Sequence, residues 1–211
     1  MSEKGVGPWS GPWPDDERFD PALLTHGDSR NVLDQYRYWT MDAIRADIAS
    51  RARGFEVAVE NLDHDFNIGS IVRTANALGA ARVHIVGAKR WNRRGAMVTD
   101  RYLDVRHWDM PADFASDCHA RGVSLVGIDN IPGSLPLESL GTAGESLSSA
   151  NQTHRSHACL VFGSEANGLS VDMVEACMGV YHITQFGSTR SMNVGHAAAI
   201  AMWVWANRDA H

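Results

Sequence analysis

The segment FEVAVENLDHDFNIGSIVRTANALGAARVHIVG, residues 55–87, decides the fold class of this 211-residue chain. Apolar runs at 55–60 and 82–87 predict two strands, and the helical spacing of apolar residues at 67–78 predicts a helix between them. Two strands joined by a single helix in so short a segment pair in parallel. The same rhythm continues to the C-terminus, with strands expected near 105–108 and at 123–129, 158–162 and 180–184, and helices at 112–121, 170–178 and 194–207. The sequence therefore predicts an α/β fold with a mostly parallel sheet and helices on both faces.

Three segments lie outside this rhythm. Residues 5–30 are rich in Pro, Gly and Trp without periodicity, and they predict an irregular arm. Residues 31–53 have roughly helical spacing. Residues 130–157 are rich in Pro, Gly and Ser, which predicts a long, mobile loop. We divide the chain into an N-terminal arm and helix, 1–53, and an α/β domain, 54–211.

Composition excludes several classes of protein. No run of 18 apolar residues is present, so we expect no membrane span. The acidic, Trp- and Pro-rich N-terminus differs from a signal peptide, and we expect a cytoplasmic protein. The three cysteines are widely spaced and are expected to be reduced. Ten histidines form no HExxH motif, so we expect no metal site.

The charge is uneven along the chain. The net charge is −6, yet residues 82–106 contain seven basic and two acidic residues, a net of +5. A local basic patch can bind phosphates on an acidic protein. Such a cluster is equally consistent with a solvated surface, so composition alone leaves an RNA partner open.

The first segment that can carry chemistry is NIGSIVRTAN, residues 67–76, at a strand-to-helix junction. Asn67 is predicted as the N-cap of the helix, whose N-terminus attracts anions. Gly69 and Arg73 are four residues apart and share a helix face, so the glycine leaves room for a ligand beside the guanidinium. The alternative is an ordinary capped helix with a surface arginine.

The second segment is LVFGSEANGLS, residues 160–170, again between a strand and a helix. It nearly matches a phosphate-binding P-loop, but Leu169 occupies the lysine position and Glu165 lies inside the loop. A triphosphate would be poorly held there. The loop suits a less anionic ligand that hydrogen-bonds to backbone groups, unless it is a simple glycine-containing turn.

The third segment is ITQFGSTRSMNVGHAAAI, residues 183–200. A strand ends, a polar turn follows, and a helix begins with small residues. Close helix packing explains the small residues of the helix. It does not explain the polar residues gathered immediately before it, which are Ser188, Arg190, Ser191 and Asn193.

Together the three segments resemble the motifs of the SpoU (TrmH-like) family of SPOUT RNA 2′-O-methyltransferases. The patterns N-x-G-x-x-x-R-T-A, V-x-G-x-E-x-x-G and Ser-Met-Asn-Val occur in the family's order, and the resemblance covers residues 55–207 approximately. It implies a C-terminal trefoil knot, a homodimer, and S-adenosylmethionine bound in the knot. The implied reaction is methyl transfer to a ribose 2′-hydroxyl of tRNA or rRNA.

The resemblance also implies roles for individual residues. Arg73 corresponds to the arginine that the family places at the ribose, and Glu165 is expected to orient that guanidinium or other polar groups. A guanidinium stays protonated at neutral pH, so it is poorly suited to act as a base. We therefore favour Arg73 as an anchor for the phosphate that also stabilises the alkoxide. The other functional polar positions are Asn67, Ser191 and Asn193; the expected cofactor-binding residues are Phe162, Gly163, Gly168, Ile183 and Met192, and the expected RNA-binding residues are Arg90, Arg93 and Arg94.

The chain departs from the family pattern at two places. Thr184-Gln185 stands where the family often has Pro-Met, and Gly195-His196 stands where it usually has Ser-Val. An acidic arm precedes the domain instead of the RNA-binding domain frequent in the family. These departures leave room for a second interpretation, a catalytically inactive RNA-binding dimer of the same fold. A nucleotide-dependent enzyme would need G-x-G-x-x-G or a complete P-loop, and neither is present.

Overall fold

The structure, a computed structural model, describes residues 5–60, 65–87, 91, 99–140, 157–189 and 191–207. Contacts between residues divide the chain into two compact units, Met1–Arg51 and Ala52–His211. Each unit is described by itself below.

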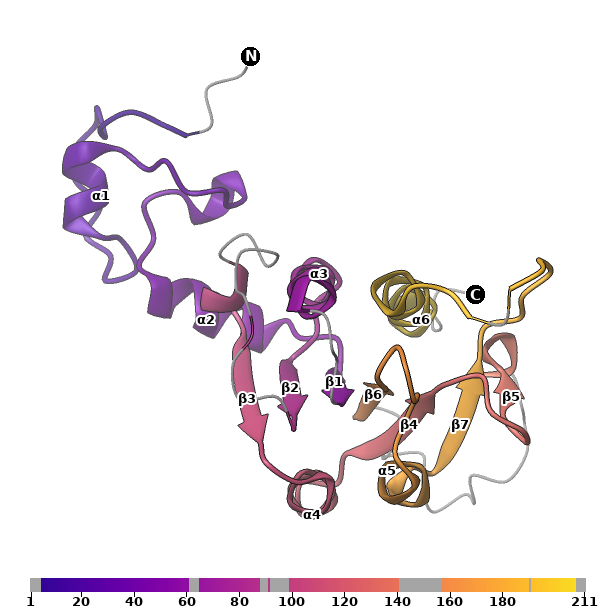
Figure 1. The fold of residues 1–211 in the computed structure, drawn as a ribbon. Coiled ribbons are helices and arrows are strands. Elements are labelled where there is room, and N and C mark those ends of the chain that lie inside the picture. The colour runs from indigo at the N-terminus through magenta and orange to yellow at the C-terminus, as the bar shows by residue number, and fades with distance from the viewer. Residues whose placement is uncertain are drawn as a thin grey trace. The chain divides into compact units, whose positions relative to one another are not determined.

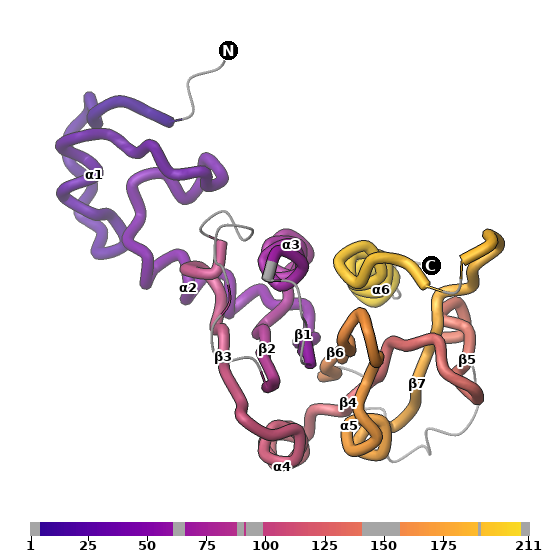
Figure 2. The backbone as a smooth tube through the Cα atoms, viewed as in Figure 1, coloured from indigo at the N-terminus to yellow at the C-terminus, as the bar shows by residue number. Residues whose placement is uncertain are grey.

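The second unit is built on a sheet of seven described strands in the order β3-β2-β1-β6-β4-β7-β5 (Figure 1). All of the neighbouring strands pair in parallel, which confirms the predicted sheet. Neighbours in the sheet come from distant parts of the sequence, as the magenta β1 beside the orange β6 shows (Figure 2). The strands are β1 (Phe55–Glu60), β2 (Arg82–Val86), β3 (Asp104–Trp108), β4 (Ser124–Ile128), β5 (Leu135–Pro136), β6 (Ala158–Phe162) and β7 (Gly179–His182).

Helices cover both faces of this sheet (Figure 1). On one face α3 (Asp65–Ala77) and α6 (Val194–Asn207) contact each other. On the other face α4 (Pro111–Ala120) contacts α5 (Val171–Ala176), which is capped by Ser170 as predicted. The alternation of the central strands separates the two cores, because Val57 and Val59 belong to the cluster with α3 and α6, whereas Ala58 belongs to the cluster with α4 and α5.

A buried polar network lies in the second of these cores. Glu56 of β1 accepts hydrogen bonds from Arg121 Nη1 at 2.6 Å and Nη2 at 2.9 Å, and it pairs with His84 Nε2 at 2.8 Å. Burial alone would raise the pKa of Glu56, but the hydrogen bonds from His84 and Arg121 outweigh the effect of burial and lower the pKa to about 2. Trp108 Nε1 donates to His84 Nδ1 at 2.9 Å, which leaves Nε2 as the nitrogen that donates to Glu56. His84 is therefore a neutral imidazole, and burial lowers its pKa.

Glu56, His84 and Cys118 also bring three possible metal-ligand atoms within 4.8 Å of one another. Arg121 Nη2, however, lies 2.9 Å from the Glu56 carboxylate and 3.4 Å from Cys118 Sγ. A guanidinium therefore already supplies the positive charge at this cluster, which we interpret as a structural network.

The first unit, Met1–Arg51, differs from the irregular arm predicted for residues 5–30. It contains α1 (Pro21–His26), and isolated bridges pair Val6 with Asp28 and Phe19 with Trp39. The Asp28 carboxylate is fully buried and accepts hydrogen bonds from Arg30 Nε and Nη2 and from the Tyr38 backbone N–H. These bonds outweigh its desolvation and lower its pKa to about 2. Most of residues 5–30 is irregular, as expected, but α1 and the compact packing were not predicted, because a buried ion pair and edge-to-face aromatic contacts, not an apolar repeat, order this segment.

Several element boundaries also differ from the sequence-based expectation. The helical spacing of residues 31–53 corresponds to a 3-10 turn, η1 (Asp34–Tyr36), followed by α2 (Met41–Ser50). A 3-10 turn, η3 (Thr99–Arg101), precedes β3. The predicted loop at 130–157 contains β5 and a further 3-10 turn, η4 (Leu137–Ser139), and residues 141–156 lie outside the described residues. Leu137 anchors this segment because only 2% of its surface is exposed. None of the described helices is both long and apolar enough to cross a bilayer.

Candidate functional site

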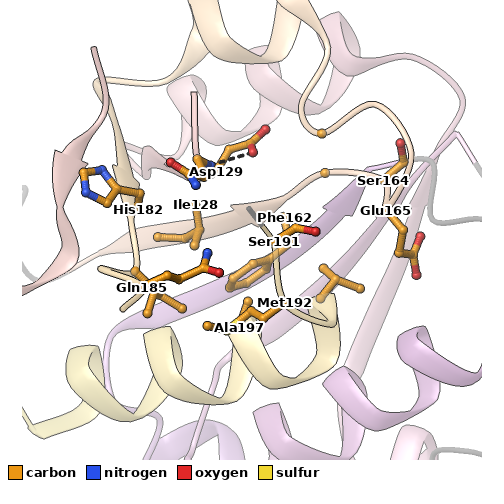
Figure 3. Close-up of a pocket in the computed structure, with 15 residues that line it drawn as sticks. Ile128, Asp129, Phe162, Ser164, Glu165, His182, Gln185, Ser191, Met192 and Ala197 are labelled. Carbon is orange, nitrogen blue, oxygen red and sulfur yellow. Dashed lines mark hydrogen bonds between the residues drawn. The ribbon is translucent and has the colours of Figure 1, made fainter. Parts of the chain in front are cut away.

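A pocket lies where β4, β6 and β7 end and α6 begins (Figure 3). Its volume of about 150 Å³ far exceeds the roughly 10–15 Å³ that one buried water needs. Carboxyl ends of neighbouring parallel strands are the usual position of a ligand site in an α/β fold. The described residues that line it are Ile128, Asp129, Asn130, Phe162, Gly163, Ser164, Glu165, Gly168, His182, Ile183, Gln185, Ser191, Met192, Val194 and Ala197.

The pocket unites residues that sequence analysis selected from two separate segments. All five residues expected to bind the cofactor line it, and so do Glu165 and Ser191. The second and third motif segments therefore meet at one cavity, although Phe162 and Met192 are 30 positions apart in the sequence.

The loop after β6 is a tight turn that only glycine permits at two positions. Ser164 and Gly168 exchange backbone hydrogen bonds of 3.0 and 2.9 Å. A Cβ atom at Gly163 would overlap the Gly168 carbonyl and the Leu169 nitrogen, closer than real side chains approach. Gly168 has φ +68°, a backbone conformation that other residues rarely adopt. The two glycines thus fix the shape of the pocket wall.

Two carboxylates from the flanking strands hold this loop in place. Asp129, directly after β4, accepts a 2.8 Å hydrogen bond from the Leu169 backbone N–H. Glu60, at the end of β1, accepts a 3.0 Å bond from the Ser170 backbone N–H and is only 1% exposed. Sequence analysis missed both residues. The available signal was an acidic residue at the end of each strand that flanks β6.

A chain of side-chain hydrogen bonds connects the three motif segments. Asn67 Nδ2 donates to Glu165 Oε1 at 2.5 Å, and Asn193 Nδ2 donates to Asn67 Oδ1 at 3.1 Å. Asn193 Oδ1 in turn accepts the backbone N–H of Gly195 at 2.9 Å, at the start of α6. We call Glu165, Asn67 and Asn193 the amide relay. It joins the pocket wall at Glu165 to α3 and α6.

The relay corrects the role predicted for Asn67. The helix α3 begins at Asp65, two residues before Asn67, so Asn67 is not its N-cap. Its side chain instead bonds to Glu165 and Asn193, and 7% of the residue is exposed. The N-cap prediction was wrong because Asn67 lies within the helix and its side-chain amide bonds to Glu165 and Asn193.

Arg73 lies outside the pocket of its own chain. It is exposed on α3 and is not among the described lining residues. The Glu165 carboxylate was expected to orient this guanidinium or other polar groups, and it accepts a 2.5 Å hydrogen bond from the Asn67 amide. Arg90, Arg93 and Arg94 lie outside the described residues, as does Arg190 of the third segment.

The side of the pocket opposite Glu165 is supported by the segment around β5. Ser134 Oγ lies 3.0 Å from His182 Nδ1, and Thr184 Oγ1 donates to Glu138 Oε2 at 3.3 Å. Thr184 is a departure from the family pattern, and its hydroxyl forms a bond that proline could not form. Lining residues that sequence analysis did not select are Ile128, Asp129, Asn130, Ser164, His182, Gln185, Val194 and Ala197.

The fold and the site define an α/β protein with a ligand pocket at the carboxyl edge of a parallel sheet. The model of the SpoU rRNA Methylase family matches residues 54–203, which is more than half of the chain. The chain therefore belongs to the SpoU rRNA Methylase family.

Relatives in sequence agree with this assignment. A tRNA (guanosine(18)-2'-O)-methyltransferase of Borreliella burgdorferi is 27% identical over 149 residues, which are 69% of this chain and 62% of that protein. YacO, a TrmH family protein of Bacillus subtilis, is 24% identical over 197 residues, which are 85% of this chain and 71% of that protein. The chain thus spans less than two thirds of the Borreliella protein.

Solved structures share the fold. The TrmH/SpoU tRNA modifying enzyme of A. aeolicus superposes with a TM-score of 0.67 at 20% identity, covering 81% of this chain and 82% of that one. The SpoU methyltransferase AviRb of Streptomyces viridochromogenes, in complex with AdoMet, gives 0.64 at 23% identity, covering 78% and 64%. An AdoMet-bound rRNA methyltransferase of Sinorhizobium meliloti gives 0.61 at 23% identity, covering 77% and 60%.

Proposed function

We propose that the protein transfers a methyl group from S-adenosylmethionine to a ribose 2′-hydroxyl of tRNA or rRNA, in the cytoplasm and as a homodimer. The observation that carries the proposal is the amide relay, because it ties the pocket-lining Glu165 to the first and third motif segments. Family membership and relatives named as RNA methyltransferases support the same activity. The trefoil knot and the division of the chain at residues 53 and 54 stay predictions.

The chemistry of the lining fits this cofactor. Ile128, Phe162, Ile183, Met192 and Ala197 provide apolar walls for an adenosyl group. The acidic side chains of the described lining are Asp129 and Glu165, and this lining contains no lysine or arginine. Such a pocket suits a cationic sulfonium and disfavours a triphosphate. When bound, the cofactor would supply an electrophilic methyl group.

The residues around the pocket would then align the acceptor hydroxyl with that methyl group. Alignment of two reactants is the main contribution an enzyme can make to a displacement of this kind. Phe162, Gly163, Gly168, Ile183 and Met192 would hold the adenosyl group, while Ser191 and Asn193 would fix the turn that begins α6. Through Asn67, the relay would hold Glu165 at the edge of the cavity where the ribose enters.

Arg73 is the residue that we propose at the substrate ribose. Its guanidinium would anchor the adjacent phosphate and stabilise the developing alkoxide, because it stays protonated. It is absent from the lining of its own chain's pocket. We therefore propose that Arg73 serves the pocket of the second subunit. Arg90, Arg93 and Arg94 would bind the RNA backbone, whose contacts position a substrate without specifying it.

A methyl-transfer assay tests the proposal. The protein is incubated with tritiated S-adenosylmethionine and with total tRNA or rRNA from cells that lack the gene, and the RNA is hydrolysed with alkali. A 2′-O-methyl group blocks cleavage at its own nucleotide, so the label should appear in alkali-resistant dinucleotides. Label in mononucleotides would place the methyl group on a base, and unlabelled RNA would remove the activity.

A further inference from the structure

The two ends of the pocket differ in chemistry, which orients a ligand within it. Ser164 and Glu165 lie at one end, and His182 and Gln185 lie at the other, with Phe162 and Met192 between them (Figure 3). The Glu165 end is joined to α3 through Asn67. Because the proposed function places the acceptor ribose beside Glu165, the reacting end of a bound cofactor would lie at this end and its adenine ring at the Gln185 end.

Gln185 places a primary amide at the same end of the cavity as His182 (Figure 3). Ile128 lies near this end, and the Gln185 side chain is half-buried and directed toward Phe162 in the middle of the lining (Figure 3). Gln185 follows β7 and lines the pocket, and its side-chain amide offers both a donor and an acceptor.

A glutamine amide matches the edge of adenine. The amide oxygen accepts from the 6-amino group while the amide nitrogen donates to the adjacent ring nitrogen, a pairing that proteins use to recognise adenine. Flat apolar walls such as Phe162 suit the faces of the same ring. A site that hydrogen-bonds a ligand group also discriminates against an analogue that lacks the group, because its own polar atoms then lose their partner.

We propose that Gln185 is a specificity-determining residue, whose side-chain amide hydrogen-bonds to the 6-amino edge of the cofactor's adenine. The inference rests on the proposed function, because it takes S-adenosylmethionine as the ligand of the pocket. It assigns a purpose to a residue that departs from the Met typical of the family at this position. Methionine fills a similar volume but offers no comparable donor.

A double-mutant cycle between protein and ligand tests this assignment by binding alone. Wild type and Gln185→Met are titrated calorimetrically with S-adenosylhomocysteine and with its analogue that carries unsubstituted purine, which lacks only the 6-amino group. Wild type should prefer the adenine ligand, and in Gln185→Met that preference should fall about fivefold or more. Asn130→Ala removes the amide of an exposed lining residue and should keep the wild-type preference. Thermal unfolding without ligand should be unchanged in Gln185→Met, which checks its fold.

The outcomes distinguish a failure of the role proposed for Gln185 from a failure of the proposed function. An unchanged preference in Gln185→Met, or a preference lost in Asn130→Ala instead, overturns the role of Gln185 and leaves the proposed function standing. Failure of wild type to bind S-adenosylhomocysteine overturns the cofactor, and the role of Gln185 with it.

Discussion

Asn67 donates a 2.5 Å hydrogen bond to Glu165, a residue 98 positions away in the sequence. The same Asn67 accepts a 3.1 Å bond from Asn193, 126 positions away. One amide therefore joins the first motif segment to the second and the third. This contact makes the three segments parts of one site. It also holds the wall of the pocket at Glu165 against α3, the helix that carries Arg73.

The first prediction concerns this relay. Asn67→Ala removes the amide that Glu165 and Asn193 share, and each of the two lost hydrogen bonds contributes about 0.5–1.5 kcal/mol. We expect kcat/KM for methyl transfer to fall by about tenfold or more. Ser70→Ala is the matched control in α3, since the Ser70 hydroxyl bonds to the Phe66 carbonyl of its own helix. Equal activities of the two variants would show that the relay has no catalytic consequence.

The second prediction concerns the carboxylate that holds the pocket loop. Asp129→Ala removes the acceptor of the Leu169 N–H, and a hydrogen bond to a charged group contributes about 1.5–3 kcal/mol. We expect KM for S-adenosylmethionine to rise roughly tenfold with a smaller change in kcat, because loop position affects cofactor binding first. Asp129→Asn retains one oxygen acceptor and should fall between wild type and Asp129→Ala. Asp172→Ala, at an exposed position of α5, should behave as wild type. A higher KM in Asp129→Asn than in Asp129→Ala would show that Asp129 does not hold the loop by accepting this hydrogen bond.

The third prediction concerns the subunit in which Arg73 acts. Arg73→Ala should lose methylation but bind the cofactor as wild type does, whereas Gly163→Ala should lose the pocket and keep Arg73. If Arg73 serves the partner's pocket, each mixed dimer has one complete site, and random mixing restores up to ~25% of wild-type activity. Inactive mixtures, with dimer exchange verified by differently tagged chains, would place Arg73 at the pocket of its own chain.

The fourth prediction concerns pH and the buried imidazole. Because burial lowers the pKa of His84 below its ordinary 6.5, the unfolded chain binds more protons than the folded chain below that pH. The free energy of unfolding should therefore fall as pH drops through 6.5, by at most about 1.4 kcal/mol per pH unit for this one proton. A further loss should follow below pH 4.5 as Glu56, with a pKa of about 2 in the folded protein, becomes a proton acceptor on unfolding.

Trp108→Phe tests the cause of the first loss. It frees His84 Nδ1 to take a proton while Nε2 still donates to Glu56, so the pKa of His84 should rise. Urea unfolding at pH 7.5 and pH 5.5 should then show a smaller difference than in wild type, although the variant is less stable overall. His119→Gln, an exposed histidine of α4, serves as the control. A wild-type difference that persists in Trp108→Phe would assign the pH dependence to another group.

The sequence was sufficient for the sheet because apolar runs such as that of β6 mark strands buried on both faces. It failed for the first unit, where Asp28 and Arg30 form a buried ion pair in a segment without apolar periodicity. It also failed for β5, a strand of two residues that pairs only with β7. A pattern of two residues carries too little periodicity to be recognised.

The site was predictable to the extent that its residues lie within motifs. Gly163, Ile183 and Met192 line one pocket, as the resemblance implied. Asp129 and Glu60 were missed because they act on backbone N–H groups of another segment, and such partners leave no side-chain pattern in the sequence. The role of Asn67 could not be predicted from the sequence alone, because an asparagine can either cap a helix or bridge two other side chains. The contacts of Asn67 with Glu165 and Asn193 decide between the two.

The most direct test of the account is a calorimetric titration of S-adenosylhomocysteine into wild type and into Gly163→Ala. The account predicts one site per wild-type chain and its loss in Gly163→Ala, because a Cβ atom there would overlap Gly168 and Leu169 and displace the pocket wall. ATP and NAD should give no binding heat in either protein. Undiminished binding in a folded Gly163→Ala variant, or its absence in wild type, would contradict the claim that this pocket holds the cofactor.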